Sequence, residues 1–78
     1  MVIFDTPSDK GWSHLAASSL EELHIFAKSI GMKIEWFQDK PGFPHYDLRG
    51  TMIDRARSRG AKEVPRKELY QFLKTNYK

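Results

Sequence analysis

Three histidines, each beside polar and aromatic residues, are the main candidates for chemistry in this chain. Their local groups are Trp12-Ser13-His14-Leu15, Leu23-His24-Ile25-Phe26-Ala27 and Pro44-His45-Tyr46-Asp47. Histidine is the side chain whose ordinary pKa lies closest to neutral pH, so it can transfer protons, bind anions or ligate metal ions. The sequence therefore indicates where a site lies more firmly than which reaction it performs.

His14 and His45 are the stronger candidates of the three. Both are predicted in loops, and loops carry functional sites more often than the flanks of helices do. We expect each to hydrogen-bond a phosphate or carbonyl oxygen or to act as an acid or base, with Asp47 orienting one of the rings. His24 lies about 100° from the centre of the apolar stripe of its predicted helix, which favours a structural hydrogen bond.

Binding of a divalent metal ion is a more specific alternative role for the same residues, although no cofactor follows from the sequence alone. Imidazole nitrogen and carboxylate oxygen suit zinc or another transition metal, with His14, His45 and Asp47 as ligands. Asp5 is a further oxygen donor in this alternative. The spacings match no local zinc motif, so only the fold can bring these residues together.

Nucleophilic catalysis has weaker support, and the sequence leaves open whether the chain is an enzyme. Ser13 adjoins His14, but adjacent residues of an extended segment point to opposite faces. The chain has no Gly-x-Ser-x-Gly elbow, no phosphate-binding glycine loop and no dinucleotide-binding fingerprint. A metal-dependent hydrolase is the enzyme class that fits best.

Composition excludes several classes of protein. A chain of 78 residues forms one domain, residues 1–78, that buries roughly 60% of its unfolded surface, so a homo-oligomer would add stability. The absence of cysteine excludes a disulfide scaffold, a thiolate zinc site and a cysteine nucleophile. No run reaches the roughly 20 apolar residues of a membrane span, and the first residues lack signal-peptide features. We therefore expect a cytoplasmic protein with no membrane partner.

The charge is distributed unevenly along the chain. Residues 1–48 carry four basic and seven acidic side chains, whereas residues 49–78 carry nine basic and three acidic ones. The second half is therefore suited to phosphate, nucleic acid or an acidic partner, or it is a solvated helix surface. Trp12 and Tyr46 are the aromatic residues favoured to stack on a base, with Arg49 as the favoured anion contact.

The first half of the chain must position Asp5 and His14. A short apolar run predicts a buried strand at residues 2–4, followed by a turn at residues 5–9. Residues 12–17 are compatible with an extended segment, but their pattern of apolar and polar residues does not assign them to one. A helix is expected over residues 20–30, because serines with capping-box spacing precede it, apolar residues recur at helical spacing, and a glycine follows it.

The second half must position His45 and Asp47. Residues 32–38 predict a second strand and residues 39–44 a loop, since two prolines and a glycine disfavour regular structure. A short helix over residues 51–59, a third strand at 61–64 and a last helix from 65 onward complete the chain. This order predicts an α/β domain of two or three layers, with a mostly parallel three-strand sheet and about three helices.

Ordered sequence groups give the chain a family resemblance. They are Asp5, Ser13-His14-Leu15, Glu22-Leu23-His24-Ile25-Phe26-Ala27, His45-Tyr46-Asp47, Gly60-Ala61 and Glu68-Leu69. In these groups the chain resembles a family of short bacterial and phage proteins known only as a domain of unknown function. Some bacterial members look fused to a metal-dependent phosphohydrolase-type domain, which implies phosphate or nucleotide chemistry only by neighbourhood.

These observations predict a small binding domain for a nucleotide-like or otherwise phosphorylated ligand. If the chain is phage-encoded, such a domain would sequester a host signal. The candidate ligand-binding residues are His14, His45, Tyr46, Asp47, Arg49, Trp12, Ser13, Asp5 and His24. The alternatives are a metal-assisted phosphoester hydrolase and a module that binds nucleic acid or an acidic protein through basic residues 49–78.

Overall fold

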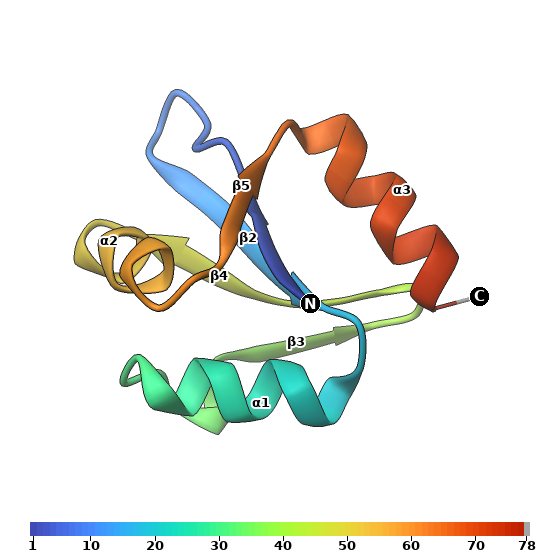
Figure 1. Ribbon diagram of the computed structural model, residues 1–78, viewed down its shortest axis with the longest axis horizontal. Coiled ribbons are helices and arrows are strands. Elements are labelled where there is room, and N and C mark those ends of the chain that lie inside the picture. The colour runs from blue at the N-terminus through green and yellow to red at the C-terminus, as the bar shows by residue number, and fades with distance from the viewer. Residues whose placement is uncertain (78) are drawn as a thin grey trace.

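The computed structural model describes residues 1–77 and contains one five-stranded sheet with helices on both faces (Figure 1). The strands are β1 (Val2–Asp5), β2 (Trp12–Ala17), β3 (Phe37–Lys40), β4 (Phe43–Arg49) and β5 (Lys62–Val64). The helices are α1 (Leu20–Ser29), α2 (Thr51–Ser58) and α3 (Arg66–Asn76), with a short 3₁₀ helix, η1, at Ile34–Trp36. The strand order across the sheet is β3-β4-β2-β1-β5.

The prediction of a mostly parallel three-strand sheet is wrong. Only β1 and β5 pair in parallel, whereas β1–β2, β2–β4 and β3–β4 are antiparallel. For two of these pairs the physical reason is the length of the connections: a short loop joins β1 to β2, and two residues join β3 to β4. Parallel neighbours need a crossover of a dozen or more residues, and connections this short permit only antiparallel pairing.

The hairpin of β3 and β4 replaces the strand and loop expected at residues 32–38 and 39–44. The turn consists of Pro41 and Gly42, and Gly42 has the positive φ (72°) that glycine adopts without steric cost. Pro44 lies inside β4 but outside the stretch from Tyr46 to Arg49 that pairs with β2. Its missing N–H therefore does not interrupt the ladder between these two strands.

The predicted helices and the last strand are confirmed with small shifts of their ends. Ser19 caps α1, and its side chain accepts a hydrogen bond from the backbone N–H of Glu22. The Glu22 carboxylate accepts a hydrogen bond from the backbone N–H of Ser18 at 3.2 Å. The two serines and the glutamate therefore satisfy N–H groups that the first helical turn leaves free.

Two apolar clusters hold helices to opposite faces of the sheet. One cluster joins the sheet residues Phe4, Leu15 and Tyr46 to α1 and α2. The other places Leu69 and Leu73 of α3 against Ile3, Ala16 and Val64. Helix α3 packs chiefly on β1, β2 and β5, so the same face of β2 and β4 is less covered toward Trp12 and Arg49.

The three helices are short and partly polar. Within residues 1–77 no helix has the length and apolar character of a membrane span.

Candidate functional site

Strand pairing brings His14, His45 and Asp47 together on the face of the sheet that carries α3. His14 of β2 lies directly opposite Asp47 of β4 in the antiparallel register. His45 precedes Asp47 by two residues, so both side chains point to the same face. One donor atom from each residue lies within 4.8 Å of those of the other two. These residues lie in strands, which corrects the expectation that His14 and His45 belong to loops.

Asp5, at the end of β1, lies beneath His14 and is completely buried. Its Oδ1 accepts a hydrogen bond from the backbone N–H of His14 at 2.6 Å, and Oδ2 lies 3.0 Å from Nδ1 of the ring. The Ser13 hydroxyl is 3.0 Å from Oδ1, and Arg66 Nε of α3 is 3.5 Å from Oδ2. This carboxylate therefore connects two strands and a helix.

The contacts of Asp5 favour its charged form. Burial alone would raise the pKa of Asp5, but the hydrogen bonds from the side chain and backbone of His14, with a smaller one from Ser13, outweigh burial. The pKa of Asp5 therefore lies below its usual value. An ionised Asp5 only accepts hydrogen bonds, so His14 donates to it from Nδ1.

His45 is held by its own strand and by an aromatic neighbour. Its Nδ1 lies 2.8 Å from the carbonyl oxygen of Phe43, and its ring stacks on the Phe43 ring with centroids 4.2 Å apart. Nε2 lies 3.3 Å from Oδ1 of Asp47. Burial lowers the pKa of His45, and it outweighs the opposing effects of the Phe43 carbonyl and the Asp47 carboxylate.

Aromatic rings form the wall of this cluster. The His14 and His45 rings meet edge to face with centroids 5.2 Å apart, and Phe43 contacts both rings. Tyr70 of α3 packs against Phe43 with centroids 5.5 Å apart. The residues predicted for this site did not include Phe43, Tyr70 or Arg66. The spacing of β4 residues would have indicated Phe43, two positions before His45, had this strand been predicted.

His24 and Tyr46 lie elsewhere, on the opposite face of the sheet. His24 Nδ1 is 2.7 Å from the hydroxyl of Tyr46, and the His24 ring packs edge to face on Phe37. Tyr46 is buried, which raises the pKa of its phenol. The structural interpretation of His24 therefore agrees with its position, and Tyr46 does not join His45 and Asp47 although it lies between them in sequence.

A pocket of about 410 Å³ adjoins the cluster at Asp47. Trp12 and Arg49 are opposite each other in the β2–β4 register, and the Arg49 guanidinium lies 5.1 Å from the centre of the Trp12 ring. The full lining is Trp12, Met32, Glu35, Trp36, Gln38, Asp47, Arg49 and Met52. The structure thus groups three of the predicted ligand-binding residues, Trp12, Asp47 and Arg49, with Trp36. Glu35, Gln38 and the two methionines were missed.

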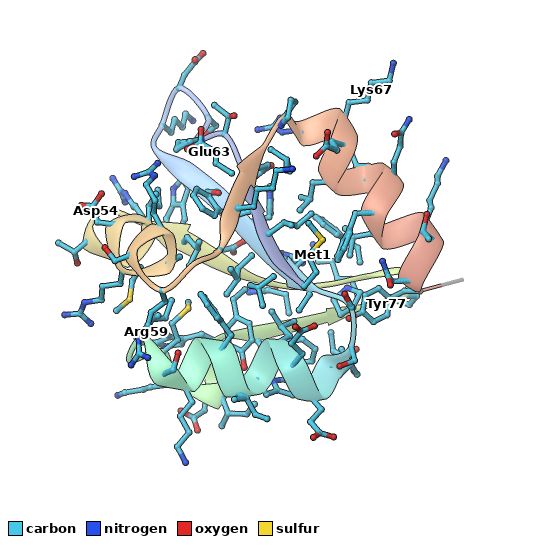
Figure 2. The ribbon with its side chains drawn as sticks, in the orientation of Figure 1. Met1, Asp54, Arg59, Glu63, Lys67 and Tyr77 are labelled. Carbon is cyan, nitrogen blue, oxygen red and sulfur yellow. The ribbon has the colours of Figure 1, made fainter. Side chains whose placement is uncertain are left out.

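The arginines of α2 and its C-terminal end are engaged in contacts within the protein. Arg55 donates to the carbonyl of Ile30, and Arg59 donates to that of Ser29. Arg57 pairs with both Asp54 and Glu63; Arg59, Asp54 and Glu63 are labelled in Figure 2. The hydrogen bond from Arg57 lowers the pKa of Glu63. A surface that binds nucleic acid needs free cationic side chains, and these contacts leave fewer of them.

The fold and the site together define a small protein of mixed strands and helices with a histidine–aspartate cluster on one face of its sheet. Residues 4–76 match a family described as a protein of unknown function (DUF4031), and the chain belongs to this family. The resemblance found in the sequence is thereby confirmed. Searches of curated proteins and of solved structures gave no match.

Proposed function

We propose that this protein binds a phosphorylated, nucleotide-like ligand in the pocket beside Asp47. The observation that carries the proposal is the meeting of two indole rings and a guanidinium, from Trp12, Trp36 and Arg49, around one hollow of about 410 Å³. Small-molecule sites commonly enclose about 300–1,000 Å³ and combine apolar walls with a few polar groups. The pocket meets both conditions.

The aromatic rings provide the stacking surface. Trp12 is 42% exposed and Trp36 is 44% exposed, although large aromatic side chains contribute most to stability when buried. Indole rings stack on any base through their π-faces. Two accessible indoles lining one pocket therefore suit a planar ring system.

Arg49 provides the anion contact. Its guanidinium lies over the Trp12 ring and, within residues 1–77, forms no ion pair with a carboxylate. Arginine binds phosphate through two parallel charge-assisted hydrogen bonds, so Arg49 is suited to the phosphate end of the ligand.

The carboxylates of Glu35 and Asp47 impose a second requirement on the ligand. Both residues line the pocket and present acceptor oxygens. Acidic side chains commonly bind ribose hydroxyls in nucleotide sites. A ligand with a phosphate, a planar ring and hydrogen-bond donors satisfies Arg49, the indoles and the carboxylates together, whereas inorganic phosphate satisfies only one of them.

The test is a binding panel of nucleoside mono- and diphosphates, the corresponding nucleosides and inorganic phosphate, read by thermal shift and calorimetry. We expect a nucleotide to raise the melting temperature more than its nucleoside or phosphate does. Arg49→Ala and Trp12→Ala should each weaken binding about tenfold or more. Arg59→Ala, an exposed arginine outside the pocket, is the matched control. Absence of any nucleotide-induced shift, or unchanged affinity in Arg49→Ala, contradicts the proposal.

The histidine–aspartate cluster supports a second candidate function, a metal-assisted phosphoester hydrolase. His14, His45 and Asp47 are the residue types that such an enzyme uses to hold a catalytic metal. The two functions differ in turnover: with added Zn²⁺ or Mn²⁺, a hydrolase releases phosphate or nucleoside from a bound nucleotide, whereas a binding protein returns it intact.

A further inference from the structure

We infer that His14, His45 and Asp47 form a binding site for a divalent transition-metal ion of the Zn²⁺ type. The site arises from the sheet register itself, since a cross-strand pair and a residue two positions along the same strand converge on one face. The inference goes beyond the nucleotide pocket and stands without it, although Asp47 borders both.

The hydrogen bonds around the rings engage Nδ1 of each histidine. His14 Nδ1 faces the buried carboxylate of Asp5, and His45 Nδ1 faces the backbone carbonyl of Phe43. Both partners are acceptors, so each ring donates from Nδ1, and the neutral form of each ring then has its lone pair on Nε2. Metal-binding histidines characteristically donate their other N–H to a carboxylate or a backbone carbonyl in this way.

The contact between His45 and Asp47 is one that a bound cation would stabilise. With its proton on Nδ1, His45 directs the lone pair of Nε2 toward Asp47 Oδ1, 3.3 Å away. Two acceptors at this distance repel each other unless a proton or a metal ion lies between them. A metal ion bound to both atoms removes the repulsion and uses both lone pairs.

The chemistry of the donors selects the class of ion. Two imidazoles with one carboxylate suit Zn²⁺, Co²⁺ or Fe²⁺, whereas Mg²⁺ and Ca²⁺ prefer all-oxygen sites. Zinc lies about 2.0–2.2 Å from such ligands, so donors now within 4.8 Å of one another would draw together by roughly 1 Å. Three protein ligands leave a coordination position for water or for an oxygen of a bound ligand.

The surroundings hold the ligands in place. Phe43 stacks on His45, and the buried Asp5 fixes both the ring and the backbone of His14. Asp47 is the most accessible of the three ligands, with a side chain 41% exposed, whereas that of His45 is 4% exposed. The ion therefore enters from the side of Asp47, which borders the pocket.

The experiment is a metal titration of chelator-treated, nucleotide-free protein. Zn²⁺ binding is followed by calorimetry, and Co²⁺ binding by its visible absorption, which reports coordination geometry. We expect one equivalent of either ion to bind. Asp47→Asn and His14→Ala should abolish stoichiometric binding, and Asp5→Asn should weaken it about 10- to 100-fold. His24→Ala, a histidine on the other face of the sheet, is the matched control and should bind as wild type.

Three results would overturn the inference. They are the absence of stoichiometric binding to the wild-type protein, unchanged affinity in Asp47→Asn, and equal loss of affinity in His24→Ala. Asp47 is partly exposed, so its amide variant keeps the fold, and circular dichroism checks this for every variant. Nucleotide titrations of chelator-treated protein remain a separate measurement, so failure of one site is distinguishable from failure of the other.

Discussion

A single buried carboxylate, Asp5, links the parts of the candidate site at the scale of residues. It accepts hydrogen bonds from the ring and backbone of His14, contacts the Ser13 hydroxyl and lies near the Arg66 guanidinium. A buried ionised group is tolerated only when such partners replace its hydration. Asp5 therefore supports both the fold and the orientation of His14.

We predict that Asp5→Asn destabilises the metal-free protein by about 2–3 kcal/mol. An amide has one acceptor oxygen in place of two and loses the charge that strengthens these hydrogen bonds. Urea denaturation of the wild type and the variant measures the difference. Asp39→Asn changes an exposed carboxylate of β3 and should have a negligible effect. Equal stabilities for the two variants would contradict the role given to Asp5.

Residue types identified the candidate site better than their predicted positions did. His14, His45, Asp47 and Asp5 were recognised as chemically able side chains, and the structure brings all four together. The separation of Tyr46 from Asp47 follows only from the alternation of side chains along β4, which was predicted as a loop. Knowledge of that strand alone would have removed Tyr46 from the list.

At the scale of elements, the helices were predictable because their signals are local. The serines before α1 and the apolar spacing within it lie within one short segment. The sheet was not predictable, since its pairing joins β2 to β4 across the intervening helix. Proline and glycine near residue 42 indicated a loop, and the structure uses them as a tight turn inside a hairpin.

The cap of α1 provides a test at this scale. We predict that Ser19→Ala lowers the free energy of unfolding by about 1 kcal/mol, because the Glu22 N–H loses its side-chain acceptor 3.2 Å away. Ser58→Ala, an exposed serine at the end of α2, is the control and should not lower stability. Chemical denaturation measures both variants. A loss in Ser58→Ala as large as that in Ser19→Ala would show that the cap is not the cause.

At the scale of the whole molecule, the two faces of the sheet have different roles. Helices α1 and α2 bury one face over the larger cluster, whereas α3 covers part of the other face (Figure 1). The partly covered face carries His14, His45 and Asp47, and the pocket beside Asp47 extends to Met32 and Met52 of the larger cluster. Polar side chains on this face are therefore free to contact a ligand while the opposite face supplies much of the core.

Tyr77, which is labelled in Figure 2, connects the C-terminal end of the described chain to the sheet. Its hydroxyl donates a hydrogen bond to the carbonyl of Ala17 at 2.6 Å. Burial, with a smaller effect from the negative charge of Glu22, raises the pKa of Tyr77 above the usual 10.0. A raised pKa in the folded state means that stability is fully present below pH 10.0 and is lost as the pH rises through the folded pKa.

We therefore predict that the free energy of unfolding falls in alkaline solution, and that it falls less steeply in Tyr77→Phe. Denaturant titrations across the alkaline range measure the slope. The matched control is Tyr70→Phe, the same change at an exposed tyrosine. A wild-type slope in Tyr77→Phe would mean that this phenol does not couple to folding.

The central claim is that the sheet register assembles a metal-binding cluster from His14, His45 and Asp47. The most direct measurement is the ¹⁵N NMR spectrum of the three imidazole rings before and after one equivalent of Zn²⁺. We predict protons on Nδ1 of His14 and His45 before addition, a shift of both Nε2 signals after it, and no change at His24. Unchanged Nε2 signals at His14 and His45, or a shift at His24, would contradict the claim.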